Sequence, residues 1–348
     1  MKTILEINKR KTEGNREGLF WSIVPGGVKC HICPNECVIG EGNTGICHNR
    51  INRDGKLYTI AYGNPCAINM DPIEKKPLNH FLPGSRAFSV AAAGCNLSCK
   101  NCQNWNISQK SPMDTLNYDL TPEKLVENAI AGKCSSVAYT YTEPLTSYEY
   151  TFDSAILARK HGLKNVLVTA GFINQLPLSH LCQYIDAANV DLKSFNNDIY
   201  LKLSRGTLDP VLCTLKIMAE MKVWLEITNL IIPGWTDDPD LIKKMCNWLA
   251  ENGLAGSPLH FSRFHPAHKL SYTKSTPIES LLKAKEIAQL EGIKYVYIGN
   301  VSGIEEANTF CPKCKDLLIQ RIGFSVVQNK LVKGHCLNCR EKIEGIWE

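Results

Sequence analysis

Between Ala87 and about Asn300, short apolar runs alternate with segments of helical periodicity. The apolar runs span residues 87–93, 135–141, 165–171, 187–193, 223–232, 259–264 and 294–299. Regular alternation of strands and helices over this length requires crossover connections between parallel strands. We therefore expect an α/β fold built as a partial (β/α)6-type, TIM-like barrel, with a doubly wound open sheet as the competing architecture.

The helix candidates between these runs carry their own start and stop signals. Thr121 and Pro122 suit the N-cap and the first helical position of one helix, and Gly162 ends another. Segments 209–221, 238–253 and 276–292 repeat this scheme. In a parallel barrel, functional groups gather at the carboxyl ends of the strands. The polar residues that follow the apolar runs are therefore candidates for a functional site.

Cysteine is unusually frequent, with 16 in 348 residues. The sequence has neither an apolar run long enough to span a membrane nor a signal-peptide pattern, so we expect a cytoplasmic protein without a membrane partner. A cytoplasm keeps thiols reduced, so clustered cysteines there indicate metal ligands rather than disulfides. The net charge of +5 is mild and no Lys/Arg cluster stands out, which gives no evident nucleic-acid partner.

The last 40 residues contain two C-x2-C pairs separated by 21 residues, Cys311/Cys314 and Cys336/Cys339. Two such pairs supply four thiolates to one tetrahedral ion, and the residues between them suit a hairpin that brings the pairs together. We expect a zinc-ribbon-like module with structural Zn²⁺; iron in a rubredoxin-like site is the alternative. A site with four protein ligands has no open position, so its expected role is structural.

A second group of four cysteines lies near the N-terminus, at Cys30, Cys33, Cys37 and Cys47. Its C-x2-C-x3-C-x9-C spacing indicates metal binding but does not distinguish zinc from an iron–sulfur cluster. Neighbouring histidines, His31 and His48, could replace a thiolate. Reduced structural cysteines in a loop are the alternative.

The third group has three cysteines, Cys95, Cys99 and Cys102, directly after the first predicted strand of the barrel. A structural metal site gains from a fourth ligand, so a set of three indicates a site with an open position. This C-x3-C-x2-C group resembles the motif of the radical SAM superfamily. The resemblance implies a [4Fe–4S] cluster on these thiolates, with one iron free to bind S-adenosylmethionine (SAM).

The same resemblance implies an activity. A flavodoxin- or ferredoxin-type reductant would supply the electron that cleaves SAM to a 5′-deoxyadenosyl radical, which abstracts hydrogen from a substrate. Hydrogen abstraction needs no acid–base pair, so the absence of such a pair from the sequence does not count against catalysis.

Other segments imply contacts with SAM. Thr142 and Glu143 in YTYTEP stand where the family holds the methionine amino group. Asp191 and Lys193 in VDLK resemble the Asp-Leu-Lys of glycyl-radical-enzyme activases, and His265 matches a histidine near the ribose. A charged pair beside a buried strand also needs a partner on general grounds.

Within the cysteine motif, Asn101 and Gln103 are further SAM candidates. Asn101 departs from the family, which usually places an aromatic residue just before the third cysteine. Trp105, a few residues further on, is a candidate to replace that ring.

A closer resemblance covers nearly the whole chain. Segments 30–50, 71–85, 93–108, 138–144, 189–195, 262–269 and 294–301, with the final cysteine module, resemble the AmmeMemoRadiSam-system radical SAM enzymes, which are pyruvate formate-lyase-activating-enzyme-like. This resemblance implies a functional link to AMMECR-like and Memo-like proteins. We expect an N-terminal Cys-rich extension at 1–85, the barrel at 86–305 and the four-cysteine module at 306–348.

Two kinds of target stay open for the radical: a backbone glycine of a partner protein, as in activases, or a small molecule or other macromolecule. A non-catalytic metal-binding adaptor is the alternative from another class. The polar stretch at 71–81 lies just upstream of the barrel. Candidates for the substrate side are Glu74, Lys76, His80 and His268.

Overall fold

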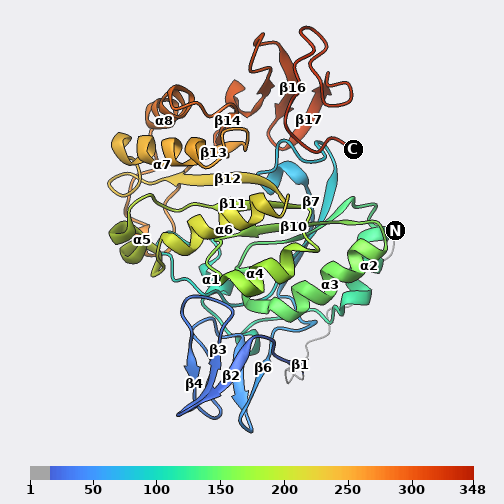
Figure 1. Cartoon of the computed structure of the whole chain (residues 1–348), viewed down its shortest axis with the longest axis vertical. Coiled ribbons are helices and arrows are strands. Elements are labelled where there is room, and N and C mark those ends of the chain that lie inside the picture. Colours follow the sequence, from blue (N-terminus) through green and yellow to red (C-terminus); the bar gives the residue numbers. More distant parts are fainter. Residues whose placement is uncertain (1–15) are drawn as a thin grey trace.

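The computed structural model describes residues 16–348, and an eight-stranded sheet forms its centre (Figure 1). Strands β8 to β14 pair in parallel and in chain order, and β7 pairs antiparallel with β8. The strands are β7 (Ala67–Pro72), β8 (Arg86–Ala91), β9 (Ser136–Tyr139), β10 (Lys164–Thr169), β11 (Ala187–Asp191), β12 (Trp224–Ile231), β13 (Leu259–Arg263) and β14 (Val296–Gly299). Sequential order without reversal excludes a doubly wound sheet and confirms the partial barrel.

Helices connect the parallel strands. They are α1 (Trp105–Ser108), α2 (Pro122–Ala131), α3 (Tyr148–Lys160), α4 (Gln175–Cys182), α5 (Asn197–Ser204), α6 (Asp209–Glu220), α7 (Pro239–Glu251) and α8 (Ile278–Leu290). Short 3-10 turns are η1 (Ile73–Lys75), η2 (Pro112–Asp114), η3 (Pro144–Ser147), η4 (His268–Leu270) and η5 (Glu305–Ala307). The Thr121 side chain accepts the N–H of Lys124 and caps α2, as its sequence predicts. None of the helices in 16–348 has the length and apolar character to cross a bilayer.

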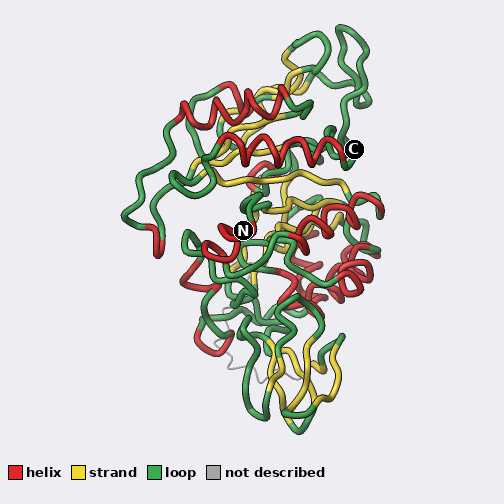
Figure 2. Tube along the Cα trace, turned by 60° about the vertical axis from the view of Figure 1, so that its left-hand side comes forward, coloured by secondary structure: helices red, strands yellow, loops and turns green. Residues whose placement is uncertain are grey.

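Two small modules lie at opposite ends of the molecule (Figures 1 and 2). The N-terminal one holds two antiparallel three-stranded sheets, β1-β6-β5 and β2-β3-β4. Their strands are β1 (Arg16–Glu17), β2 (Trp21–Val24), β3 (Gly27–Cys30), β4 (Val38–Ile39), β5 (Arg50–Arg53) and β6 (Lys56–Thr59). A buried Arg50–Glu149 ion pair, with Nη2 2.8 Å from Oε1, joins this module to α3.

The C-terminal module consists of β15 (Thr309–Phe310), β16 (Leu317–Ile322) and β17 (Ser325–Asn329). The antiparallel β16–β17 pairing confirms the hairpin expected between the two cysteine pairs. The chain end docks on the barrel through hydrogen bonds from Leu82 N to Ile346 O and from Ile346 N to His80 O. Strand β7 also joins the barrel sheet, although it lies within the range 1–85 that we expected for the N-terminal extension.

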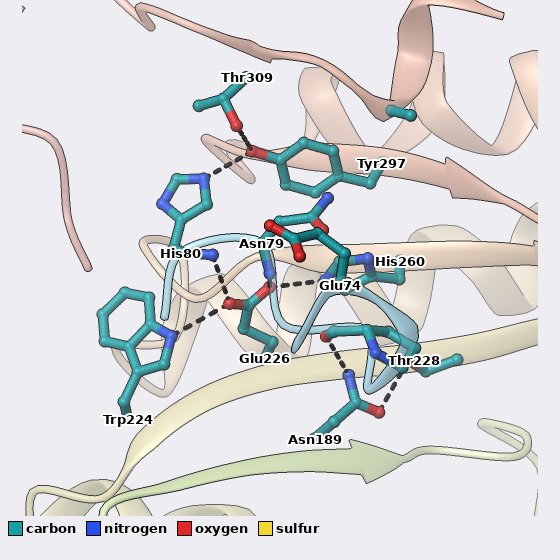
Figure 3. Close-up of polar contacts among 12 residues, drawn as sticks. Glu74, Asn79, His80, Asn189, Trp224, Glu226, Thr228, His260, Tyr297 and Thr309 are labelled. Carbon is teal, nitrogen blue, oxygen red and sulfur yellow. Dashed lines mark hydrogen bonds and ion pairs between the residues drawn. The ribbon is translucent and has the colours of Figure 1, made fainter. Parts of the chain in front are cut away.

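The loop at 76–82 reaches the amino ends of the barrel strands, where a polar network holds it (Figure 3). The fully buried Glu226 carboxylate accepts hydrogen bonds from the backbone N–H groups of Asn79, at 2.9 Å, and His80, at 2.7 Å. It also contacts Trp224 Nε1 at 3.2 Å and His260 Nε2 at 2.7 Å. Since buried charges require such partners, this network fixes the end of the barrel opposite the carboxyl ends of the strands.

His80 makes this network sensitive to acid. Burial lowers the pKa of His80 to about 4, although Glu226 and the Glu344 backbone favour the charged form. Its ring is therefore neutral at pH 7, with Nδ1 2.6 Å from Glu344 O and Nε2 2.5 Å from the Tyr297 hydroxyl. An unfolded histidine titrates near 6.5, so between these pKa values the unfolded chain binds the extra proton and stability falls as pH falls.

We expect wild type to lose about 2 kcal/mol more unfolding free energy than His80→Gln between about pH 7 and pH 5. Urea unfolding at both pH values measures this difference. The lowered pKa of Glu226 acts in the same direction, and His80 is one of its causes, so the comparison measures His80 together with its coupling to Glu226. Equal losses in the two proteins would show that His80 does not titrate as described.

Candidate active site

The three-cysteine loop begins just after β8, at the carboxyl end of the first parallel strand. Gly94 has φ +91°, and a Cβ there would lie 2.2 Å from the Cys47 carbonyl oxygen, so only glycine fits. The backbone N–H of Gly94 donates to Ile107 O at 2.9 Å, and Ser98 N donates to Ser204 O at 3.0 Å. These hydrogen bonds fix the loop at Gly94 and at Ser98, on either side of Cys95.

The cysteine loop and the strand ends border a pocket that opens to solvent; its non-protein space, about 1330 Å³, includes that open part. Every expected cluster ligand and most expected SAM contacts line it: Cys95, Cys99, Cys102, Asn101, Gln103, Thr142, Glu143, Asp191 and Lys193. His265 is not among the lining residues; it is exposed, with Nε2 3.4 Å from the carbonyl of Asn300, which does line the pocket.

The donor set fits an iron–sulfur cluster better than a single ion. The three thiols are partly exposed and face a common pocket. Among residues 16–348, only the C-terminal cysteines form a group of three or more metal-ligating side chains within 4.8 Å of one another. At least one pair of sulfur atoms in the central loop is therefore more than 4.8 Å apart, wider than the roughly 3.8 Å separation that four thiolates around one zinc ion require.

Glu143 is buried at the base of this pocket. Its carboxylate accepts hydrogen bonds from Thr169 Oγ1 at 2.7 Å, Ala170 N at 2.8 Å and Leu145 N at 3.2 Å. Burial raises its pKa to about 7, against the opposing effect of these donors and of Lys193. The carboxylate is thus held rigidly, and a cation entering the pocket would favour its ionised form.

Asp191 ends β11 and Lys193 follows it two residues later; Lys193 Nζ and Asp191 Oδ2 lie 3.1 Å apart, and both residues line the pocket. Burial alone would lower the pKa of Lys193, but Asp191 and Cys99 raise it well above its usual value. The side chains therefore form a charged pair beside the cysteine loop, able to contact a zwitterionic ligand.

A second polar group borders the pocket through Lys75 and Tyr141. Asp71 accepts from Lys75 at 2.9 Å, from Lys76 at 2.6 Å and from the Tyr141 hydroxyl. Burial would raise the pKa of Asp71, but hydrogen bonds led by that of Lys76 bring it well below its usual value. Burial also lowers the pKa of Lys76 to about 8.

The candidates for the substrate side do not line the pocket. Lys76 reaches it only through Asp71 and Tyr141, and His80 belongs to the Glu226 network. Glu74 is buried and accepts from Gly84 N at 2.8 Å. The His268 ring stacks on Trp105, with centroids 5.3 Å apart, and Trp105 does not line the pocket either.

Several lining residues did not stand out in the sequence. They are Asn104, Thr140, Thr228, Ser262 and Asn300. Lys75, by contrast, comes from the polar stretch at 71–81 that we considered for the substrate side. A signal existed for Thr228, since Glu226 and Thr228, two residues apart on the buried strand β12, place polar side chains on the same face of the sheet. Asn300 follows β14 directly, the position that a parallel barrel gives to functional groups.

The C-terminal cysteines form a compact tetrad. Cys311 Sγ lies 3.5 Å from Cys339 Sγ, and Cys314 Sγ lies 3.7 Å from Cys336 Sγ. The backbone N–H of Cys339 lowers the pKa of the Cys336 thiol to about 7. These separations suit four thiolates around one metal ion.

Comparison with known proteins agrees with this geometry. The family model described as "Radical SAM superfamily" matches residues 90–245. Uncharacterized protein MJ0808 of Methanocaldococcus jannaschii is 44% identical over 332 residues, covering 94% of this chain and 99% of that protein. The pyruvate formate-lyase 1-activating enzyme of Escherichia coli K12 is 24% identical over 232 residues, covering 62% of this chain and 93% of that enzyme.

Among solved structures, a radical SAM methyltransferase from Sphaerobacter thermophilus is similar, with a TM-score of 0.48 and 18% identity over 68% of this chain and 71% of that one. The family match includes the cysteine loop and the strands β9 to β12 that frame its pocket. From this match and the relative aligned over almost its full length, we conclude that the chain belongs to the radical SAM superfamily.

Proposed function

We propose that this radical SAM enzyme abstracts a hydrogen atom from a backbone glycine of a partner protein. The observation that carries the proposal is the similarity to the pyruvate formate-lyase 1-activating enzyme, which extends over 93% of that enzyme.

In this proposal each group of lining residues has a role. Cys95, Cys99 and Cys102 hold the cluster, and Thr142 and Glu143 receive the methionine amino group of SAM. Asp191 and Lys193 contact the rest of the cosubstrate, with Asn101 and Gln103 nearby. His265 would reach the ribose only through a movement of its exposed side chain toward the pocket.

When bound, the [4Fe–4S] cluster supplies the electron that splits SAM into methionine and a 5′-deoxyadenosyl radical. The protein orients SAM and limits water. The Glu143 carboxylate, already held by three donors, gives the amino group a fixed anionic partner. Apolar lining residues such as Leu203, Leu230 and Ile232 keep water away from the reactive carbon.

Partners follow from this chemistry. The enzyme needs a one-electron donor of the flavodoxin or ferredoxin type, and AMMECR-like and Memo-like proteins are the first candidates for a functional link. We also propose that the C-terminal tetrad holds structural Zn²⁺, because its sulfur separations of 3.5 and 3.7 Å match a single tetrahedral ion.

The glycine proposal is tested by following deuterium. Protein extract from cells grown on α-deuterated glycine is incubated with the reduced enzyme and unlabelled SAM, and 5′-deoxyadenosine is analysed by mass spectrometry. We expect deuterium in 5′-deoxyadenosine from the macromolecular fraction, and loss of this signal after protease treatment.

An extract labelled in alanine instead of glycine is the matched control and should give no transfer. Deuterium transfer confined to the small-molecule filtrate would contradict the glycine target and favour a small substrate. Neither result alters the assignment to the radical SAM superfamily.

Lys193 gives a separate test of the SAM site. Lys193→Ala should weaken SAM binding by about 10–100-fold, the effect of losing one charged hydrogen bond in a partly buried site. Equilibrium dialysis with labelled SAM measures it, and iron content should remain at the wild-type level. Lys202→Ala, which removes an exposed lysine on α5, is the control; unchanged affinity in Lys193→Ala would exclude this contact.

A further inference from the structure

The N-terminal cysteines surround a pocket of their own. Cys30 ends β3, Cys37 directly precedes β4, and Cys30 N donates to Cys37 O at 3.0 Å. Together with Cys33 and Cys47, these residues line a small pocket that is partly open to solvent; its non-protein space, about 370 Å³, includes that open part. Four thiols that converge on one pocket form a ligand set, which a group of unrelated structural cysteines would not.

The spacing of the four thiols distinguishes between a single metal ion and an iron–sulfur cluster as the occupant. In the C-terminal tetrad the closest sulfur pairs are 3.5 and 3.7 Å apart, as a single ion requires. Within residues 16–348, no three of the N-terminal thiols form a group with all sulfur atoms inside 4.8 Å. The thiols of the central loop, which hold the family's [4Fe–4S] cluster, share this wider spacing. Widely spaced thiols around one pocket fit a multi-iron core, whose thiolates bind four separate irons.

The walls of this pocket suit such a core. Cys30 and Cys47 are buried, as are the apolar neighbours Ile32 and Ile39, so most of the pocket is shielded from water. Cys33 and Cys37 are partly exposed. Burial and limited solvent access are the features that stabilise iron–sulfur clusters and set their potentials.

Arg50 indicates that the occupant is anionic. Its side chain lines the pocket and is only 2% exposed. Its guanidinium donates to both Glu149 oxygens, at 2.8 and 2.9 Å, and to Leu19 O at 2.9 Å. Among the described residues, however, Nε has no hydrogen-bond partner. A buried unpaired donor is costly, and a thiolate-ligated cluster offers it a negatively charged acceptor.

The pocket adjoins the SAM-cleaving site. In the cysteine loop, Cys95 and Leu97 line the large pocket while Asn96, between them, lines the N-terminal one. Asn35 Nδ2 donates to Asn96 O at 2.8 Å, and Gly94 packs against the Cys47 carbonyl. The two ligand sets therefore lie on opposite sides of one short loop.

We propose that Cys30, Cys33, Cys37 and Cys47 bind a second [4Fe–4S] cluster, ligated by protein at all four irons. This cluster is distinct from the one that cleaves SAM. The proposal rests on the thiol spacing, the pocket and Arg50, and does not depend on the glycine target.

Metal and sulfide analysis of the full chain, reconstituted without oxygen, tests it. We expect about eight irons, eight acid-labile sulfides and one zinc per chain. About four irons and four sulfides with two zincs would overturn the proposal, because the second zinc would occupy the N-terminal thiols. About four irons and four sulfides with one zinc would also overturn it, because the N-terminal thiols would then hold no metal. Acid-labile sulfide separates a cluster from iron bound by four thiolates alone.

Two variants locate the second cluster. Cys95→Ala/Cys99→Ala/Cys102→Ala leaves the N-terminal set intact and should retain about four irons, four sulfides and the EPR signal of a reduced cluster. Cys33→Ala should lose about four irons and four sulfides, those of the N-terminal cluster, and keep the central cluster. Cys213→Ala, on α6 and outside all three groups, should keep both. A triple variant that folds but contains no sulfide would contradict the proposal even if Cys33→Ala fails to fold.

Discussion

Replacing Cys99 by alanine is expected to reduce 5′-deoxyadenosine formation by at least about 10³-fold, because the reaction has no comparable route without the cluster. Cys99 lines the pocket between the cysteine loop and the Asp191–Lys193 pair. Two remaining thiolates cannot hold the cluster with only one iron open. Anaerobic assays with dithionite as reductant and chromatographic detection of 5′-deoxyadenosine measure the effect.

Cys213→Ala is the matched control for this loss, since it removes a partly exposed cysteine from α6, away from the pocket. It should keep wild-type activity, and Cys99→Ala should keep the zinc that we propose for the C-terminal tetrad. A Cys99→Ala protein that still forms 5′-deoxyadenosine at the wild-type rate would exclude this loop as the cluster site.

The second large effect concerns the C-terminal module. Cys311→Ala removes one of four ligands from a module whose small core includes Tyr297, Leu318, Ile319 and Ile343. In so small a module, metal binding contributes directly to folding. We expect loss of the bound metal and a rise of at least about 100-fold in amide hydrogen exchange across β15 to β17.

The central sheet is the internal control in this experiment. Exchange in β9 to β12 should change little, because their buried apolar residues belong to the main core or to the small cluster around Leu78 and Phe81, and none belongs to the module's core. The loop at 79–82 should exchange faster, since Leu82 N donates to Ile346 O. Unchanged exchange in β15 to β17 after metal loss would show that the tetrad does not stabilise the module.

Much of the barrel could be predicted from the sequence. Each apolar run corresponds to a strand, such as 223–232 to β12 (Trp224–Ile231), because parallel strands covered on both faces are continuously apolar. Helices with strong end signals are also predicted, such as α7, which begins at Pro239 after the N-cap residue Asp238. The sequence does not predict the short helices α4 and α5. It also does not predict the N-terminal sheets, because strands of two to four residues carry too little periodicity.

The site was predictable where chemistry is local in sequence and not where it depends on tertiary contacts. The cysteine loop and the Thr142–Glu143 pair are short motifs, and both line the pocket. Glu74 and His80 lie in an equally polar segment, yet tertiary contacts hold both side chains away from the pocket, with Glu74 on Gly84 N and His80 beside Glu226. The partner of His80 is Glu226, 146 residues away, a distance over which sequence spacing has no information.

The central claim is that the three-cysteine pocket performs reductive SAM cleavage. Its most direct measurement is the yield of 5′-deoxyadenosine and methionine from the reduced, cluster-loaded wild-type chain with SAM. We predict equal amounts of the two products, formed only when both the reductant and the cluster are present. A fully loaded and reduced chain that binds SAM but forms neither product would contradict this account.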